Sequence, residues 1–212
     1  MTTWAIVVAA GGGSRFGAAK QFLRLGDASV LDRAVGVATE ACDGVVVVLP
    51  VDAPWSAPGG IRTTTGGATR SDSVRAGLAR IPDDAHIVVV HDAARPLASR
   101  RLFATVIDVV GRGADAAVPA VPLTDTVKRV LHDRVLETIA RDGLVAVQTP
   151  QAFRVAALRA AQTSEEVDTD DAALVERAGG RVVVGPGESR NLKITRADDL
   201  ELAQALLGRA DQ

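Results

Sequence analysis

Aromatic residues, cysteine and long apolar runs are all scarce in this chain of 212 residues. Only 3% of the residues are aromatic and none is tyrosine, which argues against the stacking platforms that bind single-stranded nucleic acid. The single cysteine, Cys42, excludes an intramolecular disulfide and a thiolate metal cluster. No apolar stretch is long enough to span a bilayer and no basic segment precedes the first strand, so we expect a cytoplasmic protein.

The chain also has little net charge, with a formal value of −2 at pH 7. This balance argues against nucleic acid or an acidic membrane face as the main partner, so basic residues must act locally. A length of 212 residues with 47% hydrophobic content is enough to bury a substantial core. We therefore expect a single domain over residues 1–212.

Short Val-rich runs alternate with segments of helical periodicity along most of the chain. Strands are predicted at residues 5–9, 45–49, 61–65, 87–90, 116–120, 145–148 and 181–184. Helices are predicted at residues 30–41, 71–80, 101–110, 156–161, 170–178 and 197–207. This alternation predicts an α/β fold with a Rossmann-like, mostly parallel sheet covered by helices on both faces. Ligands of such sheets bind beyond the carboxyl ends of the strands.

Residues 122–142 interrupt the alternation. Within them, TDTVKRVLHDRVLETI contains two β-rich stretches that flank His132 and Asp133, which favours an antiparallel hairpin over a βαβ unit. The hairpin could pack on its own domain, or it could be an arm that reaches another subunit.

The segment AIVVAAGGGSRFGAAKQ at residues 5–21 joins a buried strand to three consecutive glycines and two cations, Arg15 and Lys20. Backbone amides of such a loop can close around an anion, so we predict a phosphate site, against the alternative of an ordinary turn. A P-loop is excluded because Gly17 is followed by alanine where lysine is required. A dinucleotide fingerprint fails because Phe16 stands at its third glycine position.

HDAARP, residues 91–96, follows the most apolar predicted strand. Asp92 would then face the ligand crevice, where a carboxylate suits Mg²⁺ held together with substrate phosphates, and Arg95 could meet a second anion. In the structural alternative, Asp92 caps the following turn and pairs with Arg95. His91 at a strand end more often makes a structural hydrogen bond than it transfers protons.

Four further polar segments follow or precede predicted elements. The loop at residues 66–73 offers amides, hydroxyls and a guanidinium to an anion or a nucleobase edge, although helix capping by Ser71 explains part of its composition. Residues 191–195 are predicted as a short strand centred on Lys193, and Thr149 ends another strand. Thr169 in an acidic run could be only a helix cap.

Seven motifs occur in one order across nearly the whole chain: AAGGGSRFG…KQ, GG..R..SV, HDAARP, DTVKR, TPQ, TDDA and NLKIT. Together they resemble the 2-C-methyl-D-erythritol 4-phosphate cytidylyltransferase family of the non-mevalonate isoprenoid pathway. Ribitol-5-phosphate cytidylyltransferases share much of this pattern and remain the alternative.

The resemblance implies a nucleotidyltransferase fold and transfer of CMP from CTP to methylerythritol phosphate, with Mg²⁺ bound at Asp92 and pyrophosphate released. It also implies a homodimer joined through the arm, with no membrane or nucleic-acid partner. The catalytic residues implied are Arg15, Lys20, Arg141 and Lys193. The nucleotide-binding residues implied are Ala9, Ala10, Gly11, Gly12, Gly13, Arg15, Lys20, Gly67, Arg70, Ser73 and Asp92. The polyol-phosphate-binding residues implied are Asp92, Arg95, Thr126, Arg141, Thr149, Thr169 and Lys193.

Three positions depart from the family pattern. Val8 and Ala19 stand where proline is frequent, and Ala68 stands where an acidic residue is frequent. Nothing after Gln212 suggests a second catalytic domain, so we expect a monofunctional enzyme. A catalytically silent nucleotide-binding module is the alternative from another class, and the presence of Arg15, Lys20, Asp92 and Lys193 together argues against it.

Overall fold

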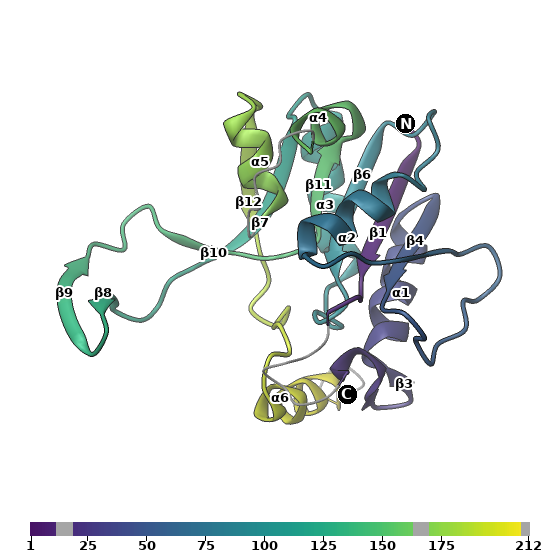
Figure 1. The fold of residues 1–212 in the computed structure, drawn as a ribbon. Coiled ribbons are helices and arrows are strands. Elements are labelled where there is room, and N and C mark those ends of the chain that lie inside the picture. The colour runs from purple at the N-terminus through teal and green to yellow at the C-terminus, as the bar shows by residue number, and fades with distance from the viewer. Residues whose placement is uncertain (12–18, 163–169, 209–212) are drawn as a thin grey trace.

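The computed structural model describes residues 1–11, 19–162 and 170–208, and its centre is an eight-stranded sheet (Figure 1). Seven strands follow the order β10-β7-β11-β6-β1-β4-β5, and β12 pairs with β7 off this path. The strands are β1 (Thr3–Val8), β4 (Gly44–Leu49), β5 (Arg62–Thr65), β6 (Ile87–Asp92), β7 (Ala116–Pro122), β10 (Val145–Val147), β11 (Gln151–Arg154) and β12 (Val182–Pro186).

Most neighbouring strands run parallel, as the alternation predicted. β1 is parallel to both β4 and β6, β4 to β5, and β12 to β7. The exceptions are β10 and β11, which run antiparallel to their neighbours. The prediction missed β11 altogether, and the strand predicted at residues 145–148 is the antiparallel β10. The α/β fold class is confirmed.

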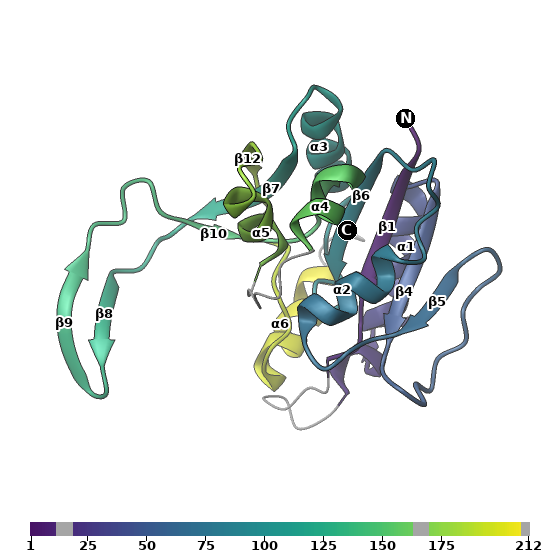
Figure 2. The same cartoon turned by 45° about the horizontal axis from the view of Figure 1, so that its top comes forward.

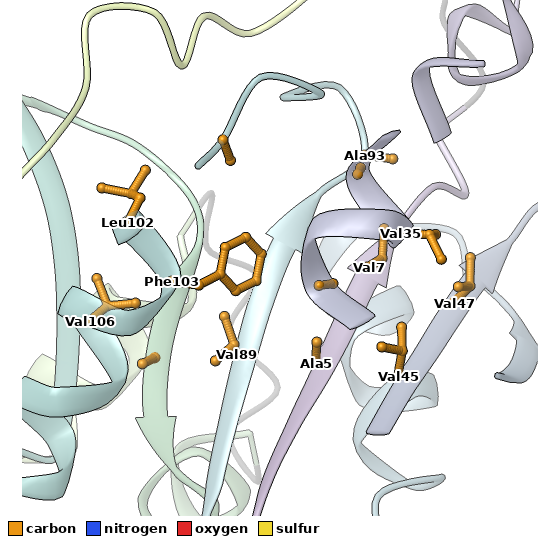
Figure 3. Close-up of a cluster of buried hydrophobic side chains, with 14 of the residues drawn as sticks. Ala5, Val7, Val35, Val45, Val47, Val89, Ala93, Leu102, Phe103 and Val106 are labelled. Carbon is orange, nitrogen blue, oxygen red and sulfur yellow. The ribbon is translucent and has the colours of Figure 1, made fainter. Parts of the chain in front are cut away.

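Helices cover both faces of the sheet because its central strands are apolar on both sides. On one face, Val7 of β1 lies against Val35 of α1 (Val30–Ala41) and Val89 of β6 lies against Phe103 of α3 (Arg100–Gly111), all in one cluster (Figure 3). On the other face, Ile6, one residue earlier, packs against α2 (Arg70–Leu78), and its cluster continues to α4 (Val155–Ala161) and α5 (Asp171–Arg177). None of the helices in the described ranges is long and apolar enough to cross a bilayer.

A smaller cluster lies where the chain's C-terminal part meets its N-terminal part. The helix α6 (Ala197–Gly208) packs through Ala203 against Leu25 and Val30. Leu25 ends β2 (Arg24–Leu25), which lies between η1 (Lys20–Phe22) and β3 (Ala28–Ser29), and Val30 is the first residue of α1. Ile194 is fully buried in the same cluster. The cluster thus holds the segments that carry Lys20 and Lys193 close to the sheet.

The hairpin predicted within residues 122–142 is present as β8 (Val127–Leu131) and β9 (Arg134–Ile139), which pair antiparallel. It projects away from the sheet in both views (Figures 1 and 2). We call residues 123–144 the arm. Its side chains are largely exposed, including Val130 and Leu131. The hairpin therefore does not pack on its own domain.

Candidate functional site

The carboxyl ends of β1 and β6 meet the first turn of α2 around a cavity of about 270 Å³. This is the edge of the sheet where a ligand was expected. The lining residues are Val8, Ala9, Ala10, Gly11, Lys20, Gln21, Gly67, Ala68, Thr69, Arg70, Ser73, Asp92, Ala93, Ala94 and Lys193. Every predicted nucleotide-binding residue within the described ranges is among them. Gly12, Gly13 and Arg15 lie outside the described residues.

Gln21 fixes the start of the glycine-rich segment. Its buried side chain donates from Nε2 to the carbonyl oxygens of Ala9, at 2.9 Å, and Gly11, at 3.2 Å. These two bonds tie η1 to the end of β1, so Lys20 is carried to the cavity wall beside them. Gln21 ends the AAGGGSRFG…KQ motif, but no role was predicted for its side chain, because these two bonds depend on how the chain folds back on itself.

The first turn of α2 forms the opposite wall. Thr69, not Ser71, caps the helix: its hydroxyl accepts from the backbone N–H of Asp72, whose carboxylate accepts from the backbone N–H of Thr69 in return. Ser71 as the cap was therefore wrong. A side chain at Gly66 would place its Cβ 2.3 Å from the Cβ of Ala10, so only glycine lets the two loops approach.

Asp92 ends β6 between two cations. Its Oδ2 lies 2.7 Å from Nζ of Lys193 and its Oδ1 lies 3.2 Å from Nε of Arg70. Burial alone would raise the pKa of Asp92, but these two cations outweigh it and hold the pKa well below its usual range. The carboxylate does not pair with Arg95, whose guanidinium donates instead to the carbonyl oxygen of Asn191. The alternative of an Asp92–Arg95 pair is therefore wrong.

Asp92 also lines a second cavity, of about 190 Å³. It brings together the predicted polyol-phosphate residues Arg95 and Thr149, and it includes Gln148 and Gln151, for which no site role was predicted. Arg70, Asp92 and Lys193 line both cavities. These three side chains therefore form the boundary across which a ligand in one cavity would meet a ligand in the other.

Hydrogen bonds from side chains, rather than a strand, place Lys193. Residues 191–195 form no strand, so that prediction was wrong. Instead, buried Asn191 donates from Nδ2 to the carbonyl oxygen of Thr149 at 2.9 Å and to Oε1 of Gln148 at 3.2 Å. The backbone N–H of Ile194 donates to the carbonyl oxygen of Ala94. The segment is thus anchored on both sides of Lys193.

Two predicted residues lie elsewhere in this chain. Thr126 and Arg141 belong to the arm and line neither cavity. Arg141 donates from Nη1 to the carbonyl oxygen of Thr124, a contact within the arm. Thr169 falls outside the described residues. A single chain therefore does not bring the arm residues to the two cavities.

Known proteins resemble this chain along almost its whole length. The family model described as IspD, 2-C-methyl-D-erythritol 4-phosphate cytidylyltransferase, matches residues 3–209. A cytidylyltransferase of that name from Rhodococcus jostii is 45% identical over 96% of this chain and 94% of its own length. The bifunctional enzyme IspD/IspF of Solidesulfovibrio magneticus is 42% identical over 97% of this chain, which spans 57% of that relative's length.

Solved structures of proteins with the same name or the same domain are also similar to this chain. The crystal structure of 2-C-methyl-D-erythritol 4-phosphate cytidylyltransferase from Thermus thermophilus is 34% identical and covers 96% of this chain and 98% of its own, with a TM-score of 0.85. The bifunctional IspDF of Campylobacter jejuni is 30% identical over 95% of this chain and 54% of its own, with a TM-score of 0.83. On these grounds, the chain belongs to the 2-C-methyl-D-erythritol 4-phosphate cytidylyltransferase family.

Proposed function

We propose that this protein transfers CMP from CTP to the phosphate of 2-C-methyl-D-erythritol 4-phosphate in isoprenoid precursor biosynthesis. The observation that carries the proposal is the pair of cavities that meet at Arg70, Asp92 and Lys193, in a chain of this family. The larger cavity suits the nucleotide and the smaller suits the polyol phosphate. Their shared boundary is where the two phosphates would react.

In this reaction, an oxygen of the polyol phosphate attacks the α-phosphorus of CTP, and the bond from that phosphorus to the bridging oxygen breaks as pyrophosphate leaves. The nucleophile is the substrate's own phosphate, so the protein supplies position and charge. Lys20, with Arg15, would stabilise the negative charge that develops at the α-phosphorus. Lys193 would orient the attacking phosphate, since its ammonium lies at the boundary of the cavities.

Asp92 is the residue that would hold Mg²⁺. No group of three or more histidine, cysteine or acidic side chains gathers as a metal site in the described ranges. One carboxylate at the mouth of a nucleotide cavity nevertheless fits Mg²⁺, which commonly takes one or two protein carboxylates and completes its shell with phosphates and water. When bound, the ion would neutralise phosphate charge. Asp92 remains a carboxylate for this purpose, because neighbouring cations lower its pKa.

We further propose that the protein works as a homodimer in which each arm completes the partner's polyol-phosphate site. Support comes from the position of Arg141 and Thr126, which lie on the arm and outside both cavities of their own chain. A two-stranded hairpin is marginally stable alone, and this one exposes Val130, Leu131 and Leu136. Burial against a second subunit would cover these side chains.

Pyrophosphate release tests the activity directly. The purified protein with Mg²⁺ and CTP should release pyrophosphate with methylerythritol phosphate much faster than with ribitol 5-phosphate. In the same assay, Lys20→Ala should lower kcat by about 10²–10³-fold, as expected when a charge-stabilising group is lost. Arg24→Ala, which removes an exposed cation outside both cavities, is the matched control. Absence of release with both polyol phosphates would refute the proposed function.

A further inference from the structure

Asp171 is a buried carboxylate that touches the site without lining either cavity. It is the first residue of α5 and only 1% exposed. Its Oδ2 lies 2.5 Å from Nη1 of Arg70, and its Oδ1 accepts from Nε2 of Gln162 at 3.2 Å. Both oxygens therefore have partners, one of them a cation that belongs to the boundary between the cavities.

Arg70 is held from two sides as a result. Its Nη1 pairs with Asp171 on α5 and its Nε pairs with Asp92 on β6. Burial alone would lower the pKa of Arg70, but the two carboxylates outweigh it and raise the pKa above its ordinary value. The guanidinium thus stays charged and has no freedom to turn toward either carboxylate alone.

The second carboxylate decides how Arg70 can engage Asp92. A guanidinium with one acidic neighbour tends to form a bidentate pair that occupies both carboxylate oxygens. Here Arg70 takes only Oδ1 of Asp92, and Oδ2 is left to Lys193 at 2.7 Å. The pull of Asp171 on Nη1 explains why the bidentate pair does not form.

We propose that Asp171 is a positioning residue, which anchors Arg70 so that Arg70 takes only one oxygen of Asp92 and the other oxygen pairs with Lys193 at the boundary of the two cavities. The inference rests on the proposed function for its catalytic consequence. Asp171 acts on the reaction through Arg70 and Asp92, because it lines neither cavity itself.

Asp171→Asn tests this inference, since asparagine keeps the size and an acceptor oxygen but loses the charge that anchors Arg70. We expect kcat/KM with CTP and methylerythritol phosphate to fall about 10–100-fold, the range found for groups that orient a metal-binding residue. Calorimetry with the α,β-methylene analogue of CTP, which cannot transfer CMP, should show weaker binding. Glu176→Gln removes an exposed carboxylate from the same helix and should change neither value.

A double-mutant cycle separates positioning from a structural role. In an Arg70→Gln background, Asp171→Asn should change analogue binding and kcat/KM by less than about twofold, because the residue through which it acts is gone. An equal loss in both backgrounds, or no loss in either, would overturn the inference. If Asp171→Asn does not fold, Arg70→Lys serves instead: one ammonium cannot bridge both carboxylates, so wild-type kcat/KM and analogue binding would overturn the inference.

The calorimetric cycle also distinguishes this inference from the proposed function. If wild type releases no pyrophosphate with either polyol phosphate, the proposed function fails. Coupling between Arg70 and Asp171 in binding of the CTP analogue would still support the positioning role. If wild type is active and the coupling is absent, only the positioning role fails.

Discussion

His91 is linked by hydrogen bonds to residues that line the two cavities. Its ring is fully buried, with Nε2 3.2 Å from the carbonyl oxygen of Arg95 and Nδ1 3.3 Å from Oγ1 of Thr149. A carbonyl only accepts, so Nε2 carries the proton and Nδ1 accepts from the threonine hydroxyl. That hydroxyl oxygen accepts in turn from the backbone N–H of Asp92. The chain of bonds requires a neutral imidazole.

Stability should therefore depend on pH through His91. Burial lowers the pKa of His91 from 6.5 to about 4, so the folded state disfavours the proton that the unfolded state binds. Its contribution is fully present above pH 6.5 and is lost as pH falls from 6.5 toward 4, at up to about 1.4 kcal/mol per pH unit. Urea unfolding of the protein without metal or nucleotide should show this slope.

His91→Gln is the comparison for that measurement, because glutamine can still donate to the Arg95 carbonyl but does not titrate. The buried carboxylates of Asp92 and Asp171 are common to both proteins, so the difference between the two curves gives the effect of the imidazole together with its interaction with Asp92. Identical slopes between pH 6.5 and 4 would contradict the prediction.

Only part of this site could be predicted from the sequence. Asp92 ends a strand, Arg95 follows that strand by three residues, and Lys20 lies three residues after Gly17. Topology concentrates ligand contacts near such strand ends, so local pattern was enough to select these residues. The Arg70–Asp171 pair joins residues 101 positions apart, and no periodicity links them. Gln148 and Asn191 likewise hold Lys193 through side-chain bonds that depend on the finished fold.

At the scale of the element, Gly77 determines how closely α2 lies on the sheet. An added Cβ at Gly77 would lie 2.6 Å from Cγ2 of Ile6 and 3.0 Å from Cγ2 of Val48. Both contacts are to fully buried side chains of the central strands β1 and β4, which have no room to move. The helix can approach these strands only because position 77 has no side chain.

The same substitution at two helical glycines should consequently have opposite effects on stability. Gly77→Ala should lower the free energy of unfolding by about 1–3 kcal/mol, since overpacking outweighs the better helix propensity of alanine. Gly36→Ala in α1 should raise it by up to about 1 kcal/mol, because nothing lies within 4 Å of its added Cβ. Denaturant midpoints at constant m-value would measure both, and a stabilised Gly77→Ala protein would contradict the packing argument.

The predictability of the elements follows from how they are stabilised. β1, β4 and β6 are buried on both faces, and their Val-rich runs made them clear in the sequence. β11 was missed because QAFR is only four residues long and its pairing comes from β6 and β7 on either side. Residues 191–195 show the reverse error: a strand was predicted there from an alternating pattern, but these residues pair with no strand.

For the whole molecule, the proposed dimer predicts complementation between two defective proteins. Arg141→Ala would impair the partner's site and Lys193→Ala its own site. In a mixed dimer, one site combines an intact body with an intact arm while the other carries both defects. After unfolding and refolding together in equal amounts, about a quarter of wild-type activity should return.

Each variant refolded alone is the control for this experiment. A mixture no more active than the average of the two variants would show that Arg141 does not act across subunits. Sedimentation of the wild-type protein at micromolar concentration should show a dimer, and a monomer with full activity would refute the shared site.

The base of the arm has a further consequence. Pro122 and Val145 are register partners in the β7–β10 pair, so the chain leaves the body and returns to it at neighbouring positions. The arm is therefore an insertion whose two ends lie side by side. Its length does not affect how any strand of the body pairs with its neighbours. Natural or engineered insertions there can change reach and partner choice while the two cavities keep their shape.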